Sequence, residues 1–157
     1  MIRGLNFVAT QKTNNNAACP AGTVANLSLG GAYSAALNNA AAALVGYGVF
    51  VAVASGGDDD DAVRYSPASE STVCTVSASD ENDTVAASSN WGALVDVYAP
   101  GKDVLSTWNT GPSATVSLLC VVCCVLRVAF ACLFTCLLVC LLRLAEFAPV
   151  IAIAAMV

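Results

Sequence analysis

Residues 23–57 read TVANLSLGGAYSAALNNAAAALVGYGVFVAVASGG, and this stretch decides the fold. Residues 23–29 form a short apolar run that ends in two glycines. Residues 33–45 predict a helix with Leu37, Ala41, Leu44 and Val45 on one face. Residues 49–54 (VFVAVA) are apolar without polar alternation, which is typical of a strand buried on both faces of a parallel sheet. The stretch therefore predicts a strand–helix–strand unit of an α/β fold.

The two predicted strands should end at the same edge of the sheet, because crossovers between parallel strands are right-handed in nearly all proteins. Small residues follow each strand, SLGG at 28–31 and ASGG at 54–57. Ligands of open α/β sheets bind beyond the carboxyl ends of strands, where glycine lets a peptide come close. We therefore expect a binding site there. Further short strands are expected at residues 73–76, 95–98 and 104–108.

Residues 28–57, together with YSPASESTVCTVSASD at residues 65–80, resemble the subtilisin-like serine proteases of peptidase family S8, specifically their proteinase K branch. The resemblance extends over residues 2–111 and implies a partial three-layer αβα fold with a parallel sheet. It also implies a serine endopeptidase that acts on peptide or protein substrates. Because that fold needs more than 157 residues, we interpret the sequence as an interior fragment of it.

The resemblance also implies a substrate-binding rim, which consists of residues 28–31 and 54–56. In the family, substrate backbone pairs with the segment that matches Ser28–Gly30, a form of strand addition, and the segment that matches Ala54–Gly56 forms one wall of the specificity pocket. The rim residues are Ser28, Leu29, Gly30, Gly31, Ala54, Ser55 and Gly56. These positions match the family well.

Calcium is the cofactor that the resemblance implies. In the family, the carbonyl groups of the residues that match Ser71 and Val73 bind it together with the carboxylate that matches Asp96. The alternative, that Asp96 merely ends a loop, stays open. The run of four aspartates at residues 58–61 could also attract a cation. Because it lacks the spacing of an EF-hand, we interpret this run as a solvated loop.

Three departures from the family concern the catalytic apparatus. The sequence has no histidine, so it lacks the general base of a Ser-His-Asp triad, and the family's aspartate and histidine match positions before residue 1. Residues 112–124 read PSATVSLLCVVCC where the family has its Gly-Thr-Ser-Met-Ala nucleophile sequence. Gly57 replaces the asparagine of the oxyanion hole, whose loss in subtilisin lowers the rate by roughly 10²–10³. We predict an inactive chain that binds peptides; the alternative is a membrane-anchored, non-catalytic interaction protein.

Composition limits the partners and the location of the protein. Charged residues make up 11% of the chain and the net charge is −5, which argues against nucleic-acid binding, since phosphate contacts need clustered Lys and Arg. Residues 1–9 show no signal-peptide pattern, and place Ile2, Leu5 and Val8 on one face of a predicted helix. The resemblance implies secretion, whereas the composition of the tail gives membrane association as the alternative.

The apolar excess lies in a tail at residues 116–157, which follows a junction at residues 112–115. Residues 116–142 carry six of the eight cysteines and predict a long apolar helix. They exceed the roughly 20 residues that a transmembrane helix needs. Three alternatives stay open for this segment: a membrane anchor, a buried helix in place of the family's central helix, or a product of out-of-frame or unspliced translation.

Overall fold

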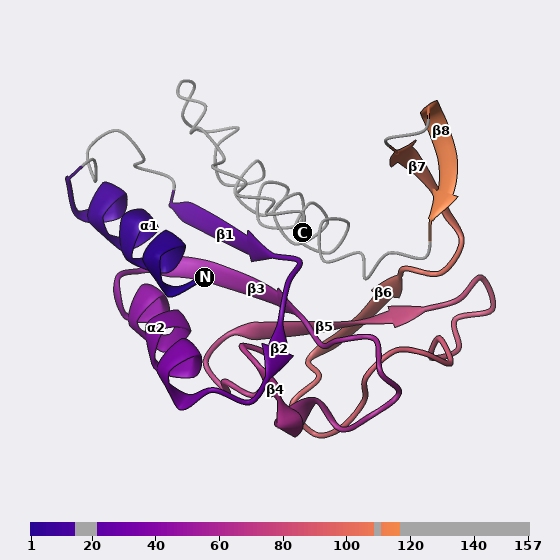
Figure 1. Cartoon of the computed structure of the whole chain (residues 1–157), viewed down its shortest axis with the longest axis horizontal. Coiled ribbons are helices and arrows are strands. Elements are labelled where there is room, and N and C mark those ends of the chain that lie inside the picture. The colour runs from indigo at the N-terminus through magenta and orange to yellow at the C-terminus, as the bar shows by residue number, and fades with distance from the viewer. Residues whose placement is uncertain (15–21, 109–110, 117–157) are drawn as a thin grey trace, which may run out of the picture.

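The computed structural model describes residues 1–14, 22–108 and 111–116 (Figure 1). Its helices are α1 (Ile2–Asn14), α2 (Ala35–Gly46) and the short 3-10 helix η2 (Ala62–Arg64). Its strands are β1 (Thr23–Leu27), β2 (Gly31–Ala32), β3 (Val49–Ala54), β4 (Tyr65–Ser66), β5 (Cys74–Ser79), β6 (Val97–Pro100), β7 (Val104–Trp108) and β8 (Gly111–Val116).

A parallel sheet with the strand order β1-β3-β5-β6 forms the centre of the described part. The strand–helix–strand unit predicted from residues 23–57 is confirmed, because β1 and β3 pair in parallel with α2 as the crossover. Thr23 lies opposite Val49 and Leu27 opposite Val53. All three pairings are parallel, so the four strands end at one edge of the sheet.

The bounds of α2 follow from the residues at its two ends. Ser34 is the N-cap, and its hydroxyl accepts a hydrogen bond from the backbone N–H of Leu37 at 3.4 Å. Tyr33, predicted to start the helix, instead donates its backbone N–H to the carbonyl of Arg64. After the helix, Gly48 adopts a φ of +76°, a left-handed conformation that glycine reaches without strain.

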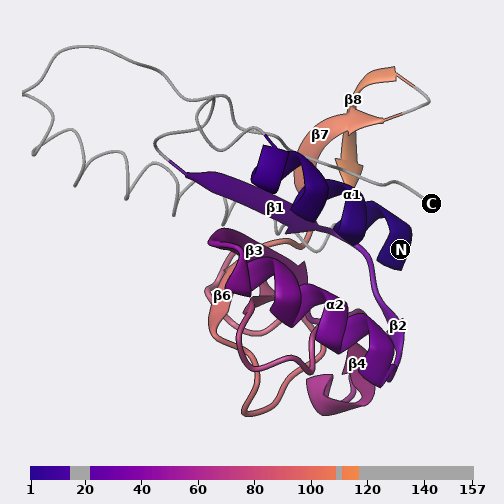
Figure 2. The same ribbon diagram turned by 90° about the vertical axis from the view of Figure 1, so that its left-hand side faces the viewer.

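The main core lies between the two α-helices and one face of the sheet (Figure 2). Its members include Leu5 and Val8 of α1, Leu37, Ala41 and Leu44 of α2, and Val49, Val51 and Val53 of β3. The opposite face holds the smaller cluster Ala52, Ala54, Val76 and Ala99. Alternate residues of β3 thus enter two cores, which explains its nearly continuous apolar sequence.

Two apolar residues are more exposed than the sequence predicts. Ile2, expected on the buried face of the first helix, is 39% exposed, since it stands at the first position of α1. Phe50 is 41% exposed although β3 was predicted to be buried on both faces. The reason is that Phe50 lies on the face of β3 opposite the helix-packed core, and the smaller cluster on that face begins only at Ala52, where β5 starts to pair with β3.

The described chain ends in an antiparallel hairpin of β7 and β8, with Val104 opposite Val116. The strand predicted at residues 104–108 is confirmed. Residues 112–115, the predicted junction between the two parts of the chain, lie within β8. The remainder of the predicted apolar segment, residues 117–142, lies outside the described residues, so the apolar helix and its three alternatives stay predictions. Within residues 1–14, 22–108 and 111–116, no helix is long and apolar enough to cross a membrane.

Candidate peptide-binding site

A cavity of about 210 Å³ lies at the carboxyl ends of β1 and β3. Its lining consists of Ser28, Leu29, Gly30, Gly31, Ala54, Ser55, Gly56, Gly57, Asp58, Tyr65 and Ser66. All seven rim residues and Gly57 are among them, so the structure brings the two predicted segments into one site. Pockets for drug-sized ligands enclose about 300–1,000 Å³, so the smaller volume of this cavity suits a single side chain.

One wall of the cavity is the chain that leaves β1 and enters β2. Gly31 of β2 lies opposite Ser66 of β4 in an antiparallel pair. A side chain at Gly30 would place its Cβ 3.2 Å from the Ser66 carbonyl oxygen, so the close approach of the two backbones favours glycine. Tyr65 and Ser66 were not expected in the site, because a strand of two residues leaves no periodic pattern in the sequence.

The opposite wall turns sharply after β3. Gly56 has a φ of +109°, in a region that other residues rarely adopt. A Cβ added at Gly56 would also overlap the side-chain amide of Asn90. Both conditions make glycine necessary at this position.

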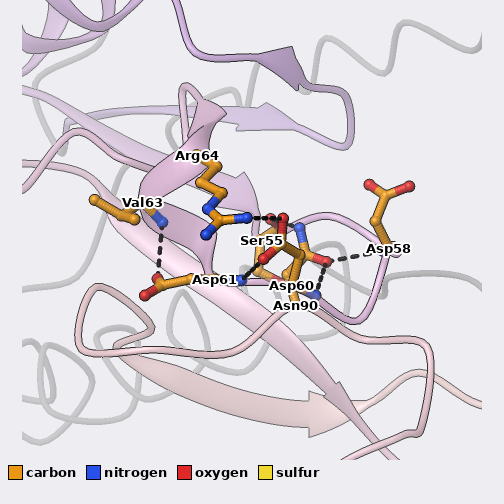
Figure 3. A network of polar contacts seen from close by, with 7 residues as sticks. All are labelled: Ser55, Asp58, Asp60, Asp61, Val63, Arg64 and Asn90. Carbon is orange, nitrogen blue, oxygen red and sulfur yellow. Dashed lines mark hydrogen bonds and ion pairs between the residues drawn. The ribbon is translucent and has the colours of Figure 1, made fainter.

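Asn90 holds this wall through four hydrogen bonds. Its side chain, drawn in Figure 3, is fully buried at 0% exposure. Its Nδ2 donates to the carbonyl of Ser55 at 2.9 Å. Its Oδ1 accepts from the backbone N–H groups of Asp58 at 2.8 Å and Asp60 at 3.2 Å. Its own backbone N–H donates to the carbonyl of Gly56 at 3.1 Å. One side chain and its peptide group therefore fix the path of the chain from residue 55 to residue 60.

Asn90 is in turn tied to the central sheet. Its carbonyl accepts a hydrogen bond from the hydroxyl of Ser77 on β5 at 2.6 Å. The hydroxyl of Ser77 lies 2.7 Å from that of Ser89, and Ser89 accepts from the backbone N–H of Ala78. These buried polar groups are thus hydrogen-bonded to one another, and they attach the cavity wall to the strand beside β3.

The acidic run at residues 58–61 is a loop, as expected, and two of its carboxylates interact with nearby residues of the same segment (Figure 3). Asp60 forms an ion pair with Arg64 at 3.3 Å. Asp61 Oδ1 accepts from the backbone N–H of Val63 at 3.0 Å and so caps η2. In the described part of the chain, His, Cys, Asp and Glu side chains form no group of three or more that could hold a metal ion.

Tyr65 lies in the cavity lining close to this acidic loop. Partial burial raises the pKa of Tyr65 above 10.0, and the negative charges of Asp58 and Asp60 and a hydrogen bond to Asp58 raise it further. The phenol is therefore protonated at neutral pH.

Asp96, the expected calcium ligand, is fixed beside the start of β5. Its Oδ2 accepts from the backbone N–H of Thr75 at 2.7 Å, and its own N–H donates to the Thr75 carbonyl at 2.9 Å. The carboxylate therefore lies next to the segment that carries Ser71 and Val73. One carboxylate and two carbonyl groups are oxygen donors of the kind that Ca²⁺ prefers, so these residues fit that ion chemically.

Known proteins are similar to this chain in both sequence and fold. The model of the subtilase family matches residues 4–122. The alkaline serine protease ver112 of Corniculantispora psalliotae is 54% identical over 117 residues, which are 74% of this chain and 30% of that protein. Proteinase R of Parengyodontium album is 50% identical over 117 residues, with the same two coverages.

Among solved structures, a cold-adapted subtilisin-like serine proteinase matches with a TM-score of 0.66 and 37% sequence identity, and the match covers 75% of this chain and 41% of that one. The chain belongs to the subtilase family, a family of serine proteases. Its relatives place it in the proteinase K branch. It spans about 30% of the length of the two curated relatives named above.

Proposed function

We propose that this chain binds an extended peptide segment along residues 28–31 and does not hydrolyse it by itself. The observation that carries the proposal is the cavity that unites residues 28–31 with residues 54–57. In strand addition, hydrogen bonds to the peptide backbone provide affinity, and a pocket for alternate side chains provides specificity. A backbone edge beside a cavity of about 210 Å³ supplies both features.

The chemistry of these 157 residues supports binding without cleavage. Acyl transfer by a serine hydrolase needs an imidazole base that activates the nucleophile and donors that stabilise the oxyanion. The sequence contains no histidine, and the cavity presents Gly57 where the family has a side-chain donor. The peptidase activity of the longer relatives is therefore not proposed for these residues alone.

The proposal predicts binding without turnover. In an NMR titration with a blocked alanine-rich tetrapeptide, the amide signals of Gly30 and Gly31 should shift, and that of the distant Gly46 should not. The same chain should release no chromophore from a chromogenic peptide and should not react with a fluorophosphonate probe. The variant Gly57→Asn should stay inactive, because it restores an oxyanion donor but no base.

Two results would contradict the proposal. Unchanged amide signals at saturating peptide would refute binding at this edge. Turnover above background that the fluorophosphonate probe abolishes would refute the absence of catalysis.

We also propose that calcium binds at Ser71, Val73 and Asp96. Asp96 supplies the only formal charge among these ligands, and Asp96→Asn keeps an oxygen that can accept from the Thr75 N–H. The substitution should therefore weaken calcium binding about tenfold or more while the fold is retained, because ligand charge sets calcium affinity. Isothermal titration calorimetry measures it, with Asp83→Asn in an exposed loop as the control of equal charge. Equal affinities of the wild type and Asp96→Asn would contradict the assignment.

A further inference from the structure

Asp58 gives the cavity a chemical character that the rim residues lack. Among the described residues that line the cavity, it is the one with a charged side chain, and the others are small, apolar or hydroxylic. Leu29 and Ala54 contribute apolar wall, and the ring of Tyr65 adds to it. The cavity therefore combines an apolar interior with one negative charge.

The conformation of the loop keeps this charge at the cavity. The backbone N–H of Asp58 is held by Asn90, and the carboxylate points away from Asn90 (Figure 3). Tyr65, another residue of the lining, lies close enough to this carboxylate for the negative charge of Asp58 to raise the pKa of the phenol. The backbone of Asp58 is thus fixed at the cavity, which lowers the entropy lost when a ligand pairs with its carboxylate.

The charge of Asp58 is reinforced by the rest of its loop. Residues 58–65 contain four aspartates against one arginine, so three negative charges remain uncompensated within this segment. The arginine, Arg64, is already paired with Asp60. A cleft lined by charges of one sign raises the local concentration of ligands of the opposite sign.

We propose that the cavity takes the side chain of a lysine or arginine from the bound peptide, with Asp58 as the residue that determines this preference. Long basic side chains bury a stem of three or four methylene groups and keep the charged head in contact with polar groups. The stem would lie on the apolar wall and the head at the Asp58 carboxylate. This inference rests on the proposed peptide binding, because the cationic residue arrives on the peptide that residues 28–31 hold.

The test compares two blocked tetrapeptides, acetyl-Ala-Ala-Ala-Lys-amide and its methionine counterpart, on the full chain by NMR titration. The lysine peptide should bind about fivefold more tightly at low salt, since Asp58 is exposed and exposed ion pairs are weak. The preference should shrink at 1 M salt, where the Debye length is only about 3 Å. Asp58→Asn should remove the preference, so that this variant binds the two peptides with equal affinity.

Glu81→Gln is the matched control, because it removes one negative charge from an exposed loop after β5 and should keep the preference. Equal or tighter binding of the methionine peptide to the wild type would overturn the inference and leave the proposed function intact. A lysine preference that survives Asp58→Asn would overturn the role of Asp58. Failure of both peptides to shift Gly30 and Gly31 would overturn the proposed function and this inference together.

Discussion

Replacing Gly56 with alanine should lower the free energy of unfolding by about 3–5 kcal/mol, a large share of the 5–15 kcal/mol typical of a folded protein. Two independent effects add up. The φ of +109° is strained for a residue with a Cβ, and the new methyl group overlaps the buried Asn90 amide. Urea denaturation followed by circular dichroism measures the change.

Gly31→Ala is the control for this substitution, because a Cβ there meets nothing within 4 Å and its φ is not in the left-handed region. The control should change the free energy of unfolding by at most about 0.5 kcal/mol, as exposed substitutions usually do. The double variant Gly56→Ala/Asn90→Ala should lose less free energy of unfolding than the sum of the losses in Gly56→Ala and Asn90→Ala. The reason is that removing the Asn90 amide removes its overlap with the new methyl group. Equal stability of Gly56→Ala and Gly31→Ala would contradict the assigned conformation.

Replacing Asn90 with alanine should lower the free energy of unfolding by about 3 kcal/mol. The substitution leaves the Ser55 carbonyl without its side-chain donor and the N–H groups of Asp58 and Asp60 without their acceptor. The Ser55 carbonyl is the group most affected, because Ser55 is fully buried and water reaches it poorly. Thermal and urea denaturation measure the loss.

Asn82→Ala makes the same chemical change at an exposed loop position and should stay within about 0.5 kcal/mol of the wild type. Amide hydrogen exchange gives a second measurement on Asn90→Ala, since the N–H groups of Asp58 and Asp60 should exchange faster in that variant. Unchanged protection of both amides would show that Asn90 does not hold the loop.

The parts of the fold that could be predicted are those with a continuous apolar signal. Residues 49–54 were predicted as a strand and form β3 to the residue, because each face of this strand enters a core. The strand expected at residues 73–76 is β5, Cys74–Ser79, and its missed half contains Ser77 and Ser79. Both serines are buried, and Ser77 is hydrogen-bonded to Asn90, so tertiary contacts outweigh polarity there.

In the candidate site, too, the parts with a local sequence signal could be predicted and those fixed by distant contacts could not. The positions of residues 28–31 and 54–57 around one cavity could be predicted, because parallel strands end at a common edge and both ends carry small residues. Asn90 could not be predicted, since the three partners of its side chain lie at least 30 residues away and no local pattern marks it. Tyr65 enters the cavity through the pairing of β2 with β4, whose two-residue strands carry no periodicity.

The contacts of the acidic loop divide its aspartates into those held through the main chain and those that use their carboxylates. Asn90 accepts a hydrogen bond from the main-chain N–H of Asp58, so this contact does not depend on which side chain is present at position 58. Asp60 and Asp61, by contrast, use their carboxylates for Arg64 and Val63. Mutations at position 58 can therefore change what the cavity prefers at little cost to folding. The loop therefore contains one position whose side chain can vary while its main-chain anchor and the sheet beneath it stay the same.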